Sequence, residues 1–268
     1  YLREIDNGVA SIEAVYGGSV SVLGRNVSIV TLAPELDKTN EVVRQLTRAG
    51  IVVSLGHSSA DLATGERAFE SGARFITHLF NAMASFHHRD PHLIGLLSNR
   101  NLVKQENIYY GIISDGIHTH PSALNVAYKA HPNGLVLVTD SMSAMGLDEG
   151  VVHQLGSKRV QIVKDEATRT RSAYVEGTNT LCGAVATMDD CIRNLMRATG
   201  CSLVEALECA SAHPAKMLRI YPQKGSLDFG ADADFVLLDD EVNIHATFIN
   251  GDFVWSRVDW CPKYTFTK

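Results

Sequence analysis

Residues 51–57 read Ile-Val-Val-Ser-Leu-Gly-His, an almost continuous apolar run that ends in a glycine and a histidine. The run lacks the alternation of polar and apolar side chains that a half-exposed strand shows, so it predicts a strand buried on both faces. Comparable short apolar runs recur on both sides of it. They span residues 27–32, 75–77, 109–114 and 135–139.

Segments with a helical spacing of apolar side chains separate these runs. Between residues 39 and 49 the apolar side chains form one stripe, and Gly50 follows where a C-terminal cap belongs. Residues 121–130 begin with Pro121, a residue that favours the first turn of a helix. Strands that alternate with helices indicate an α/β fold in which both faces of a parallel sheet are covered.

The chain changes character after the fifth apolar run. Residues 151–182 predict a hairpin-like excursion with a polar connection. Further elements are expected at 184–199 and 203–212 (helices) and at 234–238 and 246–255 (strands). Ser202 and Glu205 have the spacing of a capping box at the start of the second helix. The dipeptide Asn250-Gly251 predicts a two-residue hairpin turn, so the C-terminal part is expected to be antiparallel.

The composition is that of an ordinary globular protein. The chain has 268 residues, of which 45% are hydrophobic, and a formal charge of −6 from 24 basic and 30 acidic side chains. These values exclude disordered and collagen-like classes. No apolar run approaches the roughly 18 residues of a membrane helix. The net negative charge gives no reason to expect nucleic acid or a membrane as a partner.

Cysteine usage favours a reducing compartment. The number of cysteines is odd and no two form a Cys-x-x-Cys pair, which predicts a cytoplasmic protein rather than a disulfide scaffold. The five cysteines are Cys182, Cys191, Cys201, Cys209 and Cys261. The sequence begins with Tyr1 instead of methionine, so we expect that a segment upstream of it is absent from this sequence.

Polar side chains directly follow four of the predicted strands. They are His57, His78, Asp115 with His118, and Asp140. Because the carboxyl ends of parallel strands meet at one edge of a sheet, where ligands bind, we expect these groups to lie close together. Neutral imidazole is a good Zn²⁺ ligand, and a nearby carboxylate can take a proton from water. His57, His78 and Asp140 therefore predict a divalent-metal site.

A plainer interpretation also fits these residues. In a chain with 11 histidines, His57 and His78 can be hydrogen-bonded polar groups where loops begin, and Asp140 can cap a helix. We interpret five further histidines as structural or solvated. These are His87, His88, His92, His131 and His153. The shared position of His57, His78 and Asp140 at one sheet edge favours the metal site.

Seven short strings carry a resemblance to a known family. They read Val-Thr-Leu-Ala-Pro-Glu at 30–35, Gly-His-Ser at 56–58, Thr-His-Leu-Phe-Asn-Ala-Met at 77–83, Ser-Asp-Gly-Ile-His at 114–118, Leu-Val-Thr-Asp at 137–140, Thr-Leu-Cys-Gly at 180–183 and Gly-Ala-Asp-Ala-Asp-Phe at 230–235. In this order, and over essentially the whole chain, they resemble N-acetylglucosamine-6-phosphate deacetylases of the amidohydrolase superfamily. The implied reaction is metal-dependent hydrolysis of N-acetylglucosamine 6-phosphate to glucosamine 6-phosphate and acetate, a step of amino-sugar catabolism.

The resemblance implies roles for the three residues of the predicted metal site. His57 and His78 match two histidines that bind the metal. Asp140 matches the catalytic aspartate, which acts as a base towards water and then as an acid towards the amine. The implied cofactor is one divalent ion, for which zinc is the first choice; iron, cobalt and manganese also suit two imidazoles and a carboxylate.

The resemblance also implies a set of substrate-binding residues. Asn81 and Ala82 match positions that contact the sugar phosphate. Arg89 matches an arginine that reaches the phosphate of the neighbouring subunit in the family's homodimer, and arginine pairs well with phosphate. The other matched positions are Asp115, Gly116, Ile117 and His118, and then Leu181, Cys182 and Gly183. Cys182 departs from the small hydroxyl residue or alanine that is usual there.

The strand count falls short of a complete barrel. A (β/α)8 barrel has eight strands, and the sequence supplies about five. We therefore expect a partial TIM-like barrel over 1–222 and a small antiparallel β unit over 223–268, half of the family's β domain. The resemblance places the other strands upstream of Tyr1, with a glutamate that is the third metal ligand. Glu35 belongs to a different family position, so we do not assign it as a ligand.

Three functions are weighed for this chain. The first is the deacetylation above, which truncation can abolish because two histidines alone hold zinc weakly. The second is a non-catalytic fragment that binds a phosphosugar or a full-length partner. The third is an amidohydrolase for another substrate, such as a cyclic amide or a different acetylated amine; the phosphate-directed residues argue against it.

Overall fold

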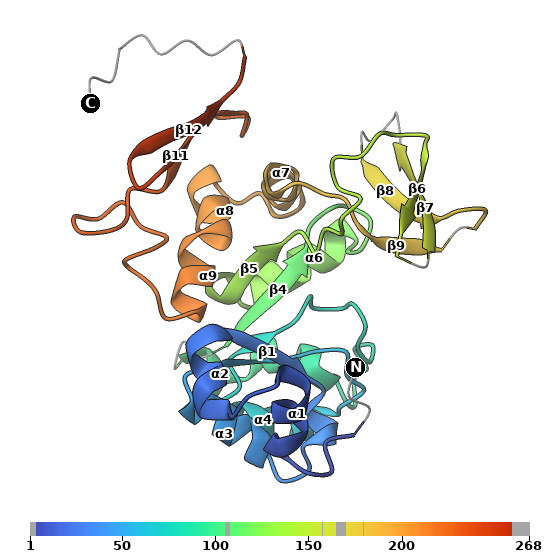
Figure 1. Cartoon of the computed structure of the whole chain (residues 1–268), viewed down its shortest axis with the longest axis vertical. Helices are drawn as coiled ribbons and strands as arrows, with labels where there is room; N and C mark the ends of the chain where they lie inside the picture. Colours follow the sequence, from blue (N-terminus) through green and yellow to red (C-terminus); the bar gives the residue numbers. More distant parts are fainter. Residues whose placement is uncertain (1–3, 105–107, 157, 165–169, 179, 259–268) are drawn as a thin grey trace.

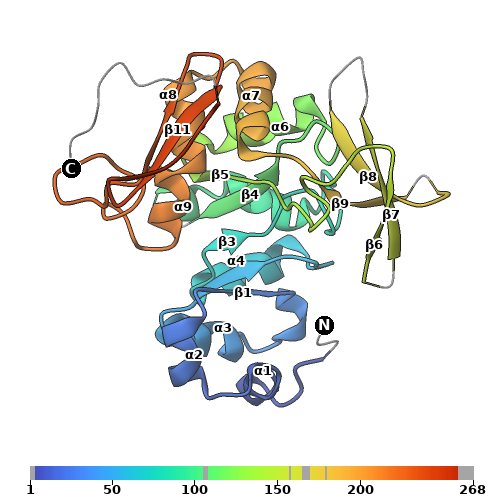
Figure 2. The same cartoon turned by 45° about the horizontal axis from the view of Figure 1, so that its top comes forward.

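The centre of the molecule is a five-stranded parallel sheet. The computed structural model describes residues 4–104, 108–156, 158–164, 170–178 and 180–258. The strands are β1 (Ile29–Leu32), β2 (Val52–Leu55), β3 (Phe75–Ile76), β4 (Tyr109–Ile113) and β5 (Leu135–Val138). Each strand pairs in parallel with the next strand along the chain, as Figure 2 shows. This order, without a reversal, is that of a barrel wall, which confirms the predicted α/β class and five-strand partial barrel.

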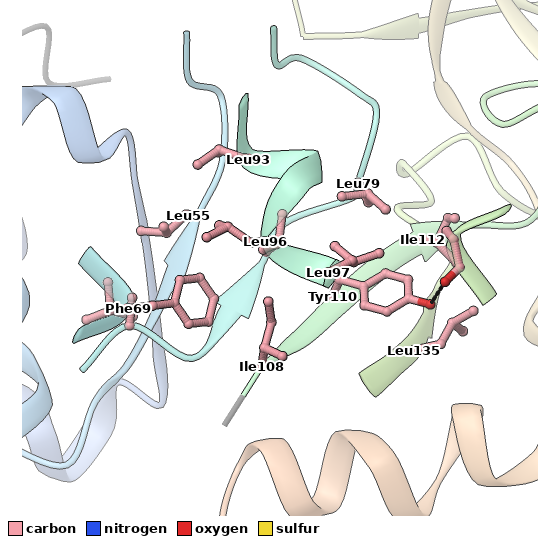
Figure 3. Packing of buried hydrophobic residues seen from close by; sticks show 14 of the residues in the cluster. Leu55, Phe69, Leu79, Leu93, Leu96, Leu97, Ile108, Tyr110, Ile112 and Leu135 are labelled. Atoms are coloured by element: carbon pink, nitrogen blue, oxygen red, sulfur yellow. Dashed lines mark hydrogen bonds between the residues drawn. The ribbon is translucent and has the colours of Figure 1, made fainter. Parts of the chain in front are cut away.

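Helices cover the outer face of this sheet. They are α3 (Glu41–Arg48), α4 (Leu62–Glu70), α6 (Pro121–Ala130), α7 (Met188–Thr199) and α8 (Leu203–Ala210), with the 3₁₀ helix η2 (His92–Ser98). Their apolar side chains form one core with the outward side chains of the strands, part of which Figure 3 draws. In that core the hydroxyl of the fully buried Tyr110 donates to the carbonyl of Ala127 at 2.8 Å. The predicted capping box of Ser202 and Glu205 begins α8.

The inner face of the sheet is packed differently from the outer face. Val52, Phe75, Tyr109 and Val136 form a smaller cluster there with Met217. Met217 ends the short helix α9 (Ala212–Met217), which follows α8 directly. The expectation of helices on both faces therefore holds in full only for the outer face, because the inner face of a barrel wall is filled by the side chains of the strands.

Several elements were not anticipated from the sequence. They are the helices α1 (Val9–Tyr16) and α2 (Val20–Asn26), and the 3₁₀ turns η1 (Pro34–Leu36) and η3 (Pro132–Gly134). The short helix α5 (Arg100–Lys104) lies between two predicted strands, where a helix was expected. Helices α1 and α2 lie beside α3 at the β1 end of the molecule (Figure 1). Among the described residues, no helix combines the length and the apolar character that crossing a bilayer requires.

A separate antiparallel sheet follows the fifth strand. It consists of β6 (Val152–Leu155), β7 (Lys158–Lys164), β8 (Arg171–Val175) and β9 (Leu181–Ala184). The predicted hairpin-like excursion is confirmed in the pairing of β7 with β8. The helix expected from residue 184 instead begins at Met188, because Ala184 ends β9 and pairs with Ser172.

A three-stranded antiparallel sheet forms the C-terminal part of the described chain. Its strands are β10 (Phe235–Leu238), β11 (Ile244–Ile249) and β12 (Asp252–Ser256). Asn250 and Gly251 make the predicted turn, with φ angles of 51° and 79°. The β6–β9 and β10–β12 sheets lie on opposite sides of the molecule (Figures 1 and 2). Cys261 and residues 259–268 lie outside the described part, and the domain boundary at 222 stays a prediction.

Candidate active site

Three predicted site residues turn the backbone sharply where a strand ends. His57 follows β2, His78 follows β3 and Asp140 follows β5, with φ angles of 51°, 26° and 49°. A non-glycine residue in this left-handed region costs on the order of 1–3 kcal/mol, and such residues cluster at functional sites. The strained turns therefore support a functional reading of these three positions.

The two histidines point their Nε2 atoms at each other. The Nε2 atoms of His57 and His78 are 3.0 Å apart, and the rings meet edge to face with centroids 4.7 Å apart. Gly56 permits this approach, because a Cβ atom at position 56 would lie 2.6 Å from the Cβ of Thr77. Two nitrogens on one tetrahedral zinc ion, at bond lengths near 2.0–2.1 Å, are about 3.3 Å apart. The pair therefore fits two ligands of a single ion.

The protonation of His57 suits a metal ligand. Burial and the neighbouring His78 ring lower the pKa of His57, against the opposite effect of the Asp140 carboxylate. The Nδ1 atom of the buried His78 has no hydrogen-bond partner among the described residues. Within the part of the chain described here, no three His, Cys, Asp or Glu side chains gather closely enough to hold an ion. The described residues thus supply two imidazole donors and no third donor close to them.

Asp140 lies on the same side of the sheet as the histidines. Its negative charge raises the pKa of both His57 and His118, so the carboxylate is within electrostatic reach of each ring. No helix begins at Asp140; the next residue instead forms an isolated bridge with Ala184 at the end of β9. The alternative role of Asp140 as a helix cap is therefore wrong.

Asp115 and His118 form a tightly bonded pair after β4. One oxygen of the buried Asp115 carboxylate accepts from the backbone N–H groups of Ile117 and His118, and the other is 2.6 Å from His118 Nδ1. Burial by itself would raise the pKa of Asp115, but these hydrogen bonds outweigh it and lower that pKa. The hydrogen bond to Asp115 raises the pKa of His118. Gly116, with φ of 78°, allows the tight turn between them.

The remaining predicted substrate residues lie on three segments around the strand ends. Asn81 and Ala82 follow His78, and the Asn81 side chain donates to the carbonyl of Leu79 at 3.3 Å. Arg89 is exposed on a turn closed by a bridge between His87 and Asp90. Leu181, Cys182 and Gly183 belong to β9. The bridge between Ser141 and Ala184 brings the end of β9 next to the residue that follows Asp140.

The other histidines have structural surroundings. His92 Nδ1 is 3.1 Å from the carbonyl of Ala60, and His131 Nε2 is 3.0 Å from that of Ile108. His153 Nε2 lies 2.9 Å from the carbonyl of Asp148. The rings of the exposed His87 and His88 contact each other, with centroids 4.3 Å apart. This agrees with the interpretation of these five as structural or solvated.

Sequence reasoning missed the partners of Glu35. Both oxygens of its carboxylate accept hydrogen bonds from Ser58 and Ser59, the two residues that follow His57. The strand-end position of Glu35 was visible in the sequence, but the serines follow a different strand. Nothing in the local pattern connects the two segments.

Comparisons with known proteins cover almost the whole chain. Residues 4–254 match the amidohydrolase family. The chain is 57% identical over 256 residues to the N-acetylglucosamine-6-phosphate deacetylase of Bos taurus. The aligned region covers 95% of this chain and 60% of that protein. It is 56% identical over 230 residues to the N-acetylglucosamine-6-phosphate deacetylase of Homo sapiens. That alignment covers 86% of this chain and 54% of the human protein.

Solved structures give the same result. The N-acetylglucosamine-6-phosphate deacetylase of Pasteurella multocida superposes with a TM-score of 0.79 at 29% identity, over 95% of this chain and 62% of that chain. A variant of the Mycobacterium smegmatis deacetylase in complex with N-acetyl-D-glucosamine-6-phosphate superposes with a TM-score of 0.75 at 29% identity. The superposition covers 91% of this chain and 60% of that chain.

These matches confirm the resemblance to deacetylases that the short motifs indicated. The chain spans about 60% of the length of the first curated relatives it matches. The strand-end histidines, the five-strand barrel wall and the match over residues 4–254 agree with one another. The chain belongs to the amidohydrolase family.

Proposed function

We propose that the protein hydrolyses the acetamide of N-acetylglucosamine 6-phosphate to glucosamine 6-phosphate and acetate. The observation that carries the proposal is the pair of Nε2 atoms of His57 and His78, 3.0 Å apart, with the Asp140 carboxylate in electrostatic reach. The names of the relatives support the choice of substrate, because the curated relatives above and the Pasteurella multocida and Mycobacterium smegmatis proteins are all called N-acetylglucosamine-6-phosphate deacetylases.

Two residues of this chain would hold the metal through their Nε2 atoms, His57 and His78. Zinc suits them best, and iron, cobalt and manganese also accept imidazole with oxygen ligands. When bound, a divalent cation polarises a carbonyl oxygen and lowers the pKa of water. A catalytic zinc normally has three protein ligands, and the described residues supply two of them here.

The proton transfers are assigned to Asp140. Its carboxylate takes a proton from the attacking water and then gives it to the leaving amine, so one group serves as base and as acid. The position of Asp140 at the end of β5, on the same sheet edge as the histidines, supports both assignments. The Asp140 side chain is exposed, so a substrate can approach it from solvent.

The substrate would be held by the segments around the strand ends. His118, whose pKa the hydrogen bond to Asp115 raises, would present an N–H donor and, when protonated, positive charge to the phosphosugar. Asn81 and Ala82 would contact the sugar phosphate, and residues 181–183 would lie over the sugar. We assign Arg89 to the phosphate of a neighbouring subunit, so the complete protein would be a homodimer. Its cysteine usage favours the cytoplasm as its location.

A second candidate function has one specific observation in its favour. The described residues contain no group of three metal donors, which suits a chain that binds a phosphosugar without turning it over. One experiment distinguishes the two candidate functions. The chain is loaded with Zn²⁺ and titrated with N-acetylglucosamine 6-phosphate in a calorimeter, while released acetate is assayed. Binding heat without acetate supports the non-catalytic candidate, and acetate that disappears with a chelator supports the enzyme.

Substitution of Asp140 tests the catalytic assignment. For Asp140→Asn we expect kcat to fall by on the order of 100-fold to 10,000-fold, since the amide cannot exchange the proton, while KM changes little. An Asp140→Asn variant that keeps near-normal kcat would remove Asp140 from the mechanism.

Matched assays of the wild-type chain on other acetylated amines and on cyclic amides test the substrate class.

A further inference from the structure

Glu35 reaches from the end of one strand to the loop after the next. It stands in η1, directly after β1, and its carboxylate is half-buried. One oxygen accepts from the hydroxyl of Ser58 at 2.6 Å. The other accepts from the backbone N–H of Ser59 at 2.8 Å and from its hydroxyl at 3.2 Å. A single carboxylate therefore holds both residues that follow His57.

The same serine connects this loop to the segment after β3. The Ser58 N–H donates to the carbonyl of Ala82, and the Ala84 N–H donates to the carbonyl of Ser58, both at 3.2 Å. These bonds form an isolated parallel bridge between Ser58 and Met83. Ser58 is almost fully buried, so its hydroxyl has little access to water in place of Glu35.

Both connected segments carry strained backbone. His57 and Ala82 have φ angles of 51° and 49°, in the region that costs a non-glycine residue free energy. Such conformations persist only where surrounding contacts enforce them. The hydrogen bonds of Glu35 are contacts of this kind for the turn at His57, and through Ser58 they reach the turn at Ala82.

We propose that Glu35 is a positioning residue that fixes the His57 loop and, through Ser58, the segment 82–84. Both of its oxygens bond serine donors, and among the described residues it does not join His57 and His78 in a group that could hold a metal ion. A carboxylate suits this task better than an amide, since its two oxygens both accept and its charge strengthens each bond. The consequence for metal binding rests on the proposed function; the effect on the loop does not.

The test compares substitutions at Glu35 with one at a neighbouring carboxylate. Asp37 is the matched control, because it is buried two residues away and accepts from the N–H of Val43 in α3, not from the His57 loop. The variants Glu35→Ala, Glu35→Gln and Asp37→Asn are made in the full chain without metal. Amide hydrogen exchange of Ser59 and Ala84 and the ring ¹⁵N resonances of His57 are measured by NMR.

In Glu35→Ala we expect exchange at Ser59 and Ala84 to become at least tenfold faster and the His57 ring resonances to shift. The Asp37→Asn variant should leave all three signals close to wild type. Glu35→Gln should restore part of the protection of Ser59, since its amide oxygen can still accept that N–H. A ring shift that the conservative variant reverses distinguishes positioning from a general loss of stability.

Zinc affinity provides the second measurement. In Glu35→Ala the affinity should fall about tenfold to a hundredfold, the usual effect of losing a group that orients a ligand. Unchanged exchange and ring resonances in Glu35→Ala would overturn the proposal. Loss of Ser59 protection when wild type is loaded with Zn²⁺ would also overturn it, because the carboxylate would then have left the serines for the ion. A wild-type chain that bound no zinc would count against the proposed function alone, and the exchange data would still decide the role of Glu35.

Discussion

The paired Asp115 and His118 give the site a charge that depends on pH. The pKa of His118 is raised from its usual 6.5, so its contribution to stability is complete below about pH 6.5 and is lost as the pH rises through the higher folded value. The pKa of Asp115 is lowered from 3.8, so its contribution is present above that pH and is lost as the pH falls through the lower folded value. Both contributions to stability are therefore present together between about pH 4 and pH 6.5; the Asp115 contribution is lost below that window and the His118 contribution above it.

Replacement of His118 tests this window. For His118→Gln we expect a loss of about 2 kcal/mol in the free energy of unfolding near pH 5.5, because a charged hydrogen bond to a buried carboxylate disappears. The loss should shrink as the pH rises above the folded pKa of His118. Urea unfolding at several pH values measures it. The exposed His88→Gln serves as control, and a loss in His118→Gln that did not vary with pH would contradict the assigned protonation.

The packing of β2 against β3 depends on the absence of a side chain at Gly56. A Cβ atom there would lie 2.6 Å from the Cβ of Thr77, whose hydroxyl also bonds Ser54. For Gly56→Ala we expect a loss of about 1–3 kcal/mol from overpacking, together with weaker zinc binding as the strand ends move apart. Chemical denaturation and a zinc titration measure the two effects.

Gly18 offers the matched glycine for this test. A Cβ atom at Gly18 would meet nothing closer than 3.9 Å, and its φ angle is not positive. Gly18→Ala should therefore leave stability and zinc binding close to wild type. Equal stability of the two variants would show that the strands can separate without cost.

Elements with a continuous apolar run were predictable, and elements set by distant partners were not. The five parallel strands appear where the runs indicated, because burial on both faces leaves its mark on local composition. Helices α1 and α2 each bury a single side chain, Ile12 in α1 and Leu23 in α2. Their sequences therefore contain no apolar stripe from which a helix could be predicted. Residues after Ala184 resemble a helix start, and only the pairing of β9 with β8 shows otherwise.

In the candidate site too, features set by local sequence were predictable and contacts between distant segments were not. The rule that functional groups follow the carboxyl ends of parallel strands predicted His57, His78 and Asp140 at one sheet edge, and the structure brings the two histidines into contact. The contact between Glu35 and Ser58 was not predictable, because it joins segments 23 positions apart that follow different strands.

The whole molecule contains hydrophobic cores that do not share residues. The main core lies between the parallel sheet and its outer helices. A separate cluster in the β6–β9 region consists of Ala144, Val160, Ile162, Ala173 and Val185. Cores that share few contacts can open independently of each other.

A buried charge in either core tests this independence. For Ala173→Asp, a fully buried position in β8, we expect fast amide exchange in β7 and β8 while β2 and β4 stay protected. Ala68→Asp, equally buried in α4, should instead unfold the parallel sheet. Hydrogen exchange with mass spectrometry measures both. Loss of protection in β2 and β4 on substitution of Ala173 would mean that the molecule unfolds as one unit.

The two ends of the segment that carries the β6–β9 sheet lie side by side, next to the end of β5. Ser141 bridges Ala184 in parallel, and the Met142 N–H donates to the Ala184 carbonyl at 2.9 Å. A segment whose two ends lie side by side can vary in length and sequence without displacing the elements that it joins, which here are β5 and α7. Since the two ends of this segment adjoin Asp140, variation within it would reshape the surroundings of the Asp140 carboxylate and leave His57 and His78 in place.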